Sequence, residues 1–130
     1  MKTTIYRIQD NEGRGPYKPV VTLQWLDANR DDTYENDHPP FFYEFELGVL
    51  ALIPNGFYAG CGFSTLDKLY AWFSTTELER LFKMGYCIVS MEVDQVIRES
   101  SKQLFFARSI PLTKNILYMP NTIFHPSTVL

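Results

Sequence analysis

The stretch from Cys61 to Asp94 limits the possible folds more than any other part of this chain, because it predicts two short helices followed by a strand. Two runs of apolar residues have the spacing of one helix face: Leu66, Leu69, Tyr70 and Phe73, and then Leu78, Leu81 and Phe82. From Val89 to Asp94, apolar and polar residues alternate as in a half-buried strand. The middle of the chain therefore predicts helix, helix and strand in that order.

Capping residues indicate where the two helices begin and end. Ser64 is placed to cap the first helix, because a serine hydroxyl can accept from the free N–H groups of the first turn. Ser74 and Glu77 have the spacing of a capping box at the start of the second helix. An equivalent pair two residues further along offers an alternative register. Gly85 favours the left-handed conformation that ends a helix, so the helices span about residues 64–84.

Weaker patterns predict further strands. Residues Thr3–Ile8 are β-branched or aromatic at alternate positions, and Gln103–Ala107 is nearly continuously apolar, which favours a central strand. Ile116–Met119 predicts a short last strand. These patterns predict an α+β fold in which a mixed or mostly antiparallel sheet carries the two helices on one face. The length predicts a single compact domain over residues 1–130.

Several segments leave their structure open. Val20–Leu26 fits a strand or one helical turn, and Phe57–Phe63 fits a short strand or a tight loop. Phe41–Ile53 is apolar but matches neither the helix period nor the strand period. Asp94–Ser101 fits a polar turn or a short helix.

Acidic residues concentrate in residues 27–37, the acidic segment. Its members are Asp27, Asp31, Asp32, Tyr34, Glu35 and Asp37, with Arg30 as the one basic residue among them. The segment is either a solvated loop or a binding surface for a protein with a basic surface. The net charge of −3 argues against nucleic acid as a partner, because phosphate binding needs clustered Lys and Arg.

Other classes of site and location find little support in the sequence. No Cys-x-x-Cys or His-Glu-x-x-His motif is present, so we expect no metal site. The N-terminus lacks the apolar region of a signal peptide, and no apolar run has the length of a membrane span. Two cysteines without such a signal fit a reducing cytosol. We expect a soluble cytoplasmic protein, and its oligomeric state stays open.

Cys61 has two alternative interpretations. It lies between two glycines just before a predicted helix N-terminus, where the pKa of a thiol can be lowered enough for nucleophilic chemistry. The other interpretation is a small buried residue in a tight turn. No base is identifiable nearby in the sequence, which favours the buried residue.

Three short segments in order resemble small bacterial and phage ADP-ribosyltransferases: Tyr6-Arg7, Phe63-Ser64-Thr65, and the run from Glu99 to Phe106. In that family, an Arg or His on the first strand holds the dinucleotide. A Ser/Thr segment leading into a helix shapes the nicotinamide pocket, and a late Glu supports the transfer.

Carried onto this chain, the resemblance implies that Arg7 anchors a dinucleotide and that Ser64 and Thr65 form the second element. Gln103 falls where the catalytic Glu is expected, and an amide cannot supply the charge of a carboxylate. Glu99 takes that role only with a shifted register. The resemblance therefore implies an NAD-dependent enzyme or a degenerate NAD-binding relative.

The chain also resembles the small accessory proteins of phages and prophages. It is acidic, rich in aromatic residues and of single-domain size. Such proteins act by binding and blocking a host protein, as anti-CRISPR proteins do. This resemblance implies a non-catalytic protein that binds a host protein, with the acidic segment as its binding surface.

Overall fold

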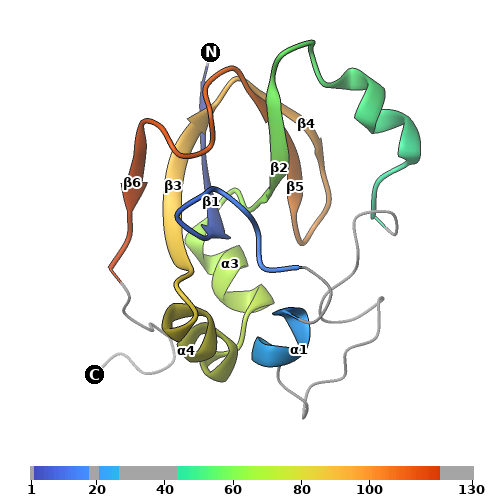
Figure 1. Cartoon of the computed structure of the whole chain (residues 1–130). Helices are drawn as coiled ribbons and strands as arrows, with labels where there is room; N and C mark the ends of the chain where they lie inside the picture. The colour runs from blue at the N-terminus through green and yellow to red at the C-terminus, as the bar shows by residue number, and fades with distance from the viewer. Residues whose placement is uncertain (1, 18–20, 27–43, 121–130) are drawn as a thin grey trace.

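The computed structural model describes residues 2–17, 21–26 and 44–120 (Figure 1). The helices and strands are β1 Thr3–Gln9, α1 Val21–Trp25, the 3-10 helix η1 Leu47–Leu52, β2 Tyr58–Gly62, α3 Leu66–Trp72, α4 Thr75–Lys83, β3 Cys87–Val93, β4 Gln95–Glu99, β5 Leu104–Arg108 and β6 Ile116–Tyr118. The predicted α+β class is confirmed. The acidic segment lies outside the described residues.

The strands form two antiparallel sheets with the orders β1-β3-β6 and β2-β5-β4. Asp94 alone separates β3 from β4, so the chain passes from one sheet into the other at this residue. A bridge between Tyr6 and Phe63 joins the sheets further along, with N···O distances of 2.8 and 2.7 Å. The sheet predicted from sequence is therefore antiparallel, but it is divided in two.

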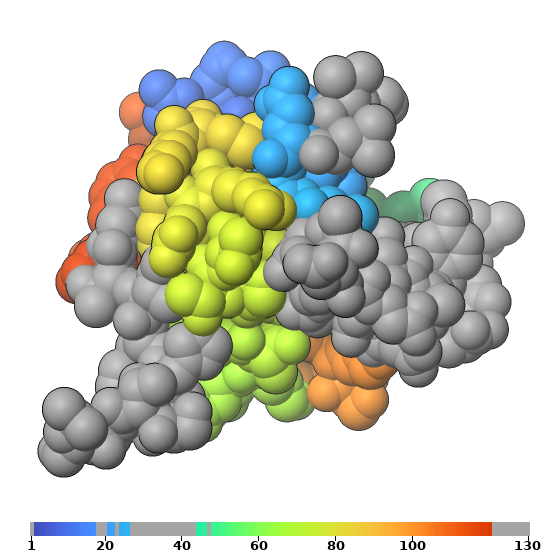
Figure 2. Space-filling model, turned by 90° about the horizontal axis from the view of Figure 1, so that it is seen from below, coloured from blue at the N-terminus to red at the C-terminus, as the bar shows by residue number. Residues whose placement is uncertain are grey.

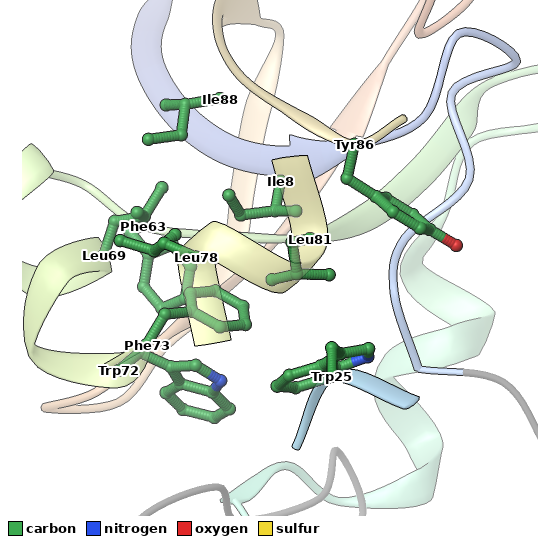
Figure 3. Packing of buried hydrophobic residues seen from close by; sticks show 10 residues of the cluster. All are labelled: Ile8, Trp25, Phe63, Leu69, Trp72, Phe73, Leu78, Leu81, Tyr86 and Ile88. Carbon is green, nitrogen blue, oxygen red and sulfur yellow. The ribbon is translucent and has the colours of Figure 1, made fainter. Parts of the chain in front are cut away.

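α3 and α4 lie together at one end of the molecule, with α1 beside α4 (Figures 1 and 2). Their apolar faces pack against Ile8 of β1 and Ile88 of β3 (Figure 3). Aromatic rings fill this cluster: Phe63 lies 5.5 Å from Trp72, and Trp25 lies 5.6 Å from Phe73 between ring centroids. The helices therefore cover one face of the β1-β3-β6 sheet, as predicted.

Two smaller clusters complete the core. The first lies between the two sheets and consists of Ile5, Val89, Met91, Val93, Leu104 and Phe106. The second holds η1 against the other face of the β2-β5-β4 sheet and consists of Phe45, Val49 and Phe105. Because neighbouring residues of a strand point to opposite faces, Phe105 and Phe106 of the central strand β5 belong to different clusters.

The structure corrects one detail at the element ends and confirms two others. Thr65, not Ser64, caps α3, because its hydroxyl accepts from the backbone N–H of Lys68 at 3.1 Å. The predicted capping box of Ser74 and Glu77 is confirmed. Gly85 follows α4 with φ 94°, the left-handed conformation predicted for it.

Residues 95–99 were expected to form a turn or a short helix and instead form the strand β4. This strand pairs with β5 across a register shift between Val96 and Arg98. The shift interrupts the period-two pattern that would have indicated a strand. The open alternatives are also resolved: residues 21–25 are a helix, and residues 58–62 are a strand.

Candidate functional site

Arg7 is the most buried charged residue among those with a predicted role. It lies on β1 with 6% of its surface exposed. Its Nη1 donates to the carbonyl oxygen of Cys61 at 3.0 Å, and its Nη2 donates to that of Gly13 at 3.3 Å. The guanidinium carbon also lies 5.7 Å from the centroid of the Phe106 ring. Arg7 therefore connects β1 to β2 and to the loop that follows β1.

The glycines on either side of Cys61 make room for this arrangement. A Cβ atom at Gly60 would collide with the Arg7 guanidinium. A Cβ atom at Gly62 would lie 2.8 Å from the carbonyl oxygen of Tyr6, in the bridge between the sheets. The Gly-Cys-Gly sequence is therefore explained by the close approach of β1 to β2, and it forms a strand rather than the tight turn expected for Cys61.

Burial changes the acid–base properties of this region. It lowers the pKa of Arg7 to about 10, so the guanidinium still carries its charge at neutral pH. Burial also raises the pKa of the Cys61 thiol to about 11, although the charge of Arg7 opposes that change. The lowered thiol pKa considered for Cys61 is therefore wrong. Its side chain packs against the cluster of Phe45 and Phe105.

Gln103 lies on the opposite side of the β2-β5-β4 sheet from Arg7. Its side-chain amide donates to Glu44 Oε1 at 2.9 Å, and the Ser100 hydroxyl donates to the same oxygen at 2.8 Å. Glu44 precedes Phe45, which packs on the face of the sheet that carries Phe105. Arg7, in contrast, lies over the ring of Phe106 on the face between the sheets.

Ser64, Thr65 and Glu99 lie near the end of the same sheet at which β2 runs into α3. Thr65 caps α3, and Lys68 in the first turn of that helix is 3.4 Å from Glu99 Oε2. Both side chains of this ion pair are partly exposed. The structure thus brings Glu99 close to the Ser64–Thr65 junction, but the Arg7 side chain binds elsewhere, to the carbonyls of Cys61 and Gly13.

Exposed apolar residues form a second candidate site around η1. Leu50, Leu52 and Tyr58 are 48%, 47% and 44% exposed, and we call these three residues the η1 surface. Figure 1 shows η1 standing out from the β2-β5-β4 sheet, on the side away from β6. Its inner residue Val49 is buried in the core. Helix η1 therefore packs against the core through Val49 and exposes Leu50 and Leu52 to solvent.

The strand β6 carries another pair of exposed apolar residues, Leu117 and Tyr118, at 69% and 60% exposure. It pairs only with β3 in the described part of the chain. It is short, and Pro120 follows almost immediately. Proline and short length both discourage further pairing at a sheet edge.

Sequence reasoning missed the η1 surface and a second buried arginine, Arg108. The sequence shows that Phe41–Ile53 is apolar, but this segment matches neither the helix period nor the strand period, so no exposed face could be predicted for it. That mismatch was itself the available signal, because a 3-10 helix has three residues per turn. Arg108 follows an apolar strand, and nothing in the sequence indicated that it would be 1% exposed.

No group of three or more His, Cys, Asp or Glu side chains in 2–17, 21–26 and 44–120 is arranged to hold a metal ion. No helix in these ranges is both long enough and apolar enough to cross a bilayer.

Comparison with known proteins gives one finding about the origin of the chain. Residues 1–115 match the family described as Bacteriophage T4 Y00F protein. The comparisons with curated proteins and with solved structures found no match.

Proposed function

The chain belongs to the Bacteriophage T4 Y00F protein family, and from this premise we propose that it binds and inhibits a protein of the host cell. It would act in the host cytoplasm as an accessory protein of infection, comparable in style to anti-CRISPR proteins. The observation that carries the proposal is the η1 surface, where the fold leaves Leu50, Leu52 and Tyr58 exposed.

The usual residue composition of protein interfaces supports a binding role for the η1 surface. Interface centres are rich in apolar and aromatic side chains, and charged groups lie around the rim. Arg98 and Glu46 supply such a rim, with Arg98 Nη2 3.1 Å from Glu46 Oε1. The partner we propose is a host protein with an apolar patch bordered by basic residues, because the chain is acidic overall and residues 27–37 concentrate its negative charge.

The experiment is capture of host proteins from a cytosolic extract by the tagged chain, followed by reconstitution with the purified partner. The double variant Leu50→Ser/Leu52→Ser should weaken binding at least tenfold, because central apolar contacts dominate interface energies. Leu117→Ser is the matched control, since it removes an equally apolar and more exposed leucine from β6. The η1 assignment fails if the control weakens binding as much as the double variant does.

The acidic segment has its own test. Changing Asp31, Asp32 and Asp37 to Asn should slow association and reduce its salt dependence, since complementary charges act mainly by steering the two proteins together. Glu79→Gln and Glu92→Gln alter exposed acidic residues of α4 and β3 and serve as controls. Equal effects of both sets would indicate that net charge alone matters.

No exposed site of this kind among the described residues supports the alternative that the chain is an NAD-dependent enzyme or a degenerate NAD-binding relative. A dinucleotide anchor needs a guanidinium that can reach phosphates, whereas Arg7 already donates to two backbone carbonyls. Titration with NAD in a calorimeter tests the alternative directly, and we expect no heat of binding. Saturable binding that Gln103→Ala abolishes would overturn that expectation.

A further inference from the structure

We propose that the turn of Pro54, Asn55 and Gly56, which joins η1 to β2, is a site of spontaneous covalent modification in the folded chain. Asn55 loses its side-chain amide there and becomes aspartate or isoaspartate. The modification needs no host partner. Its basis is the sequence of the turn, the exposure of its residues and the room around the reacting groups.

The reaction uses only groups of the chain and water. The backbone nitrogen of Gly56 attacks the side-chain carbon Cγ of Asn55 and closes a succinimide ring. The bond from Cγ to Nδ2 breaks, and Nδ2 leaves as ammonia with the proton of the Gly56 N–H. Water then opens the ring at one of its two carbonyls, which gives aspartate or isoaspartate, and nothing is oxidised or reduced. Because both reacting groups belong to neighbouring residues, ring closure is intramolecular.

The residue that follows an asparagine controls this reaction. Asparagine is one of the chemically labile residues, and a side chain on the next residue shields the attacking nitrogen and restricts the backbone, which glycine does not. Asn55 is the one asparagine of the chain that is followed by glycine. The other asparagines in the described ranges, Asn11 and Asn115, are followed by Glu12 and Ile116.

The turn leaves both reacting groups accessible. Asn55 and Gly56 are exposed, and neither the Asn55 side chain nor the Gly56 N–H donates a hydrogen bond to another described residue. The hydrogen bond that closes the turn runs from the Phe57 N–H to the Pro54 carbonyl at 3.0 Å and occupies neither group. A Cβ atom added at Gly56 would meet no described atom within 4 Å beyond its chain neighbours. The ring therefore has room to form.

The products change the edge of the η1 surface. Asn55 lies between Leu52 and Tyr58 in the chain, so a carboxylate replaces a neutral amide between two members of that surface. A carboxyl group of this kind is ionised at neutral pH. Isoaspartate also places the Cβ atom of residue 55 in the main chain, which lengthens the connection from η1 to β2 by one atom.

The test incubates the folded chain at mildly alkaline pH in water enriched in ¹⁸O. The chain is then digested in ordinary water, and its peptides are measured by mass spectrometry. Only conversion during the incubation introduces ¹⁸O, so modification during digestion is recognised. We expect Asn55 to convert about tenfold or more faster than Asn11 and Asn115, because only its attacking nitrogen belongs to a glycine.

Asn55→Gln is the matched control, since it keeps an exposed amide but has to close a larger ring. It should gain almost no ¹⁸O in this peptide. An isoaspartate methyltransferase with a labelled methyl donor should label the incubated wild type and leave Asn55→Gln unlabelled. Asn55→Asp carries the charge of the aspartate product, so it marks the position on ion exchange at which the converted wild type elutes.

The wild type unfolded in guanidinium chloride is incubated in parallel and shows how fast Asn55 reacts without the turn. Two outcomes would overturn the proposal. One is a rate at Asn55 in the folded chain that is no higher than at Asn11 and Asn115. The other is conversion of Asn55 in the unfolded chain alone, which would mean that the closed turn protects it.

Discussion

Arg108 shows how a single side chain can organise a segment that lacks regular structure. Its Nε donates to the carbonyl of Glu92, and its two terminal nitrogens donate to the carbonyls of Pro111, Lys114 and Asn115 at 2.7 to 2.9 Å. These bonds fix the chain between β5 and β6. A planar guanidinium can reach several carbonyls in different directions, which a lysine ammonium cannot do from one nitrogen.

Arg108→Lys should therefore lower the free energy of unfolding by about 2–4 kcal/mol, because several backbone carbonyls lose charge-assisted hydrogen bonds to a buried guanidinium. Urea denaturation measures the change. Arg98→Lys is the control, since Arg98 forms an exposed ion pair with Glu46 and should cost less than about 1 kcal/mol. Similar losses for the two variants would contradict the role given to Arg108.

Gly60 tests the packing around the other buried arginine. Gly60→Ala should destabilise the fold by about 1–3 kcal/mol, because the added methyl group collides with the Arg7 guanidinium. Gly48→Ala adds the same group where no atom of the described residues lies within 4 Å, and its effect should stay within about 0.5 kcal/mol. A Gly60→Ala protein as stable as the wild type would show that the Arg7 side chain or the two strands can move enough to accommodate the methyl group.

The roles of single residues were the least predictable part of this chain. Arg7 was correctly placed on the first strand, but the sequence could not show that its side chain points between two sheets. Cys61 was expected in a turn and lies in a strand, because the glycines beside it provide space for Arg7 and for the Tyr6 carbonyl. Such close approaches depend on tertiary contacts between distant segments.

At the scale of elements, the cap of α3 provides a sharp test. Thr65→Ala should cost about 1 kcal/mol of stability, because its hydroxyl accepts from the Lys68 backbone N–H. Ser64→Ala changes the preceding residue, which is not the N-cap, and should cost less. The thermal unfolding midpoints of the two variants show which residue caps α3. A larger loss for Ser64→Ala would restore the cap predicted from the sequence.

Elements with local signals were predicted well, and those that depend on partners were not. The capping box at Ser74 and the glycine after α4 are local features, and both are confirmed. The strand β4 was missed because its register shift hides the alternation. The division into two sheets was also missed, since it depends on which strands pair after Asp94.

Asp94 connects the turn between β3 and β4 to two other segments. Its Oδ1 accepts from Lys2 Nζ at 2.8 Å, and its Oδ2 accepts from the backbone N–H of Ser109 at 2.6 Å. These hydrogen bonds, that of Lys2 first, lower the pKa of Asp94 to about 2. A carboxyl group with a lowered pKa in the folded state contributes stability above its unfolded pKa of about 4, and this contribution disappears as the pH falls through 2.

Lowering the pH from about 4 to 2 should therefore destabilise the wild type more than Asp94→Asn, which has no carboxyl group to protonate. Urea denaturation at a series of pH values measures the difference. Lys2→Met keeps Asp94 but removes its main hydrogen-bond donor, so the folded-state pKa of Asp94 should rise, and the acid-induced loss should be smaller than in the wild type and end at a higher pH. Parallel pH curves for wild type and Asp94→Asn would rule out this contribution.

At the scale of the whole molecule, a well-connected core carries an exposed apolar face at η1. Arg7, Arg108 and the capped helices hold the two sheets and the helices together. Gln103, which was predicted to lie at a catalytic position, instead donates a hydrogen bond to Glu44 within this scaffold. Leu50, Leu52 and Tyr58 remain exposed on this scaffold, and for this reason we propose the η1 surface as the site of partner binding.

Hydrogen–deuterium exchange of the chain with and without its purified host partner tests this assignment most directly. The account predicts slower exchange at the backbone amides of residues 47–58, which include η1 and the start of β2. Exchange in β6, at residues 116–118, should be unchanged. Protection of β6 or of α4 with no change at residues 47–58 would contradict the account.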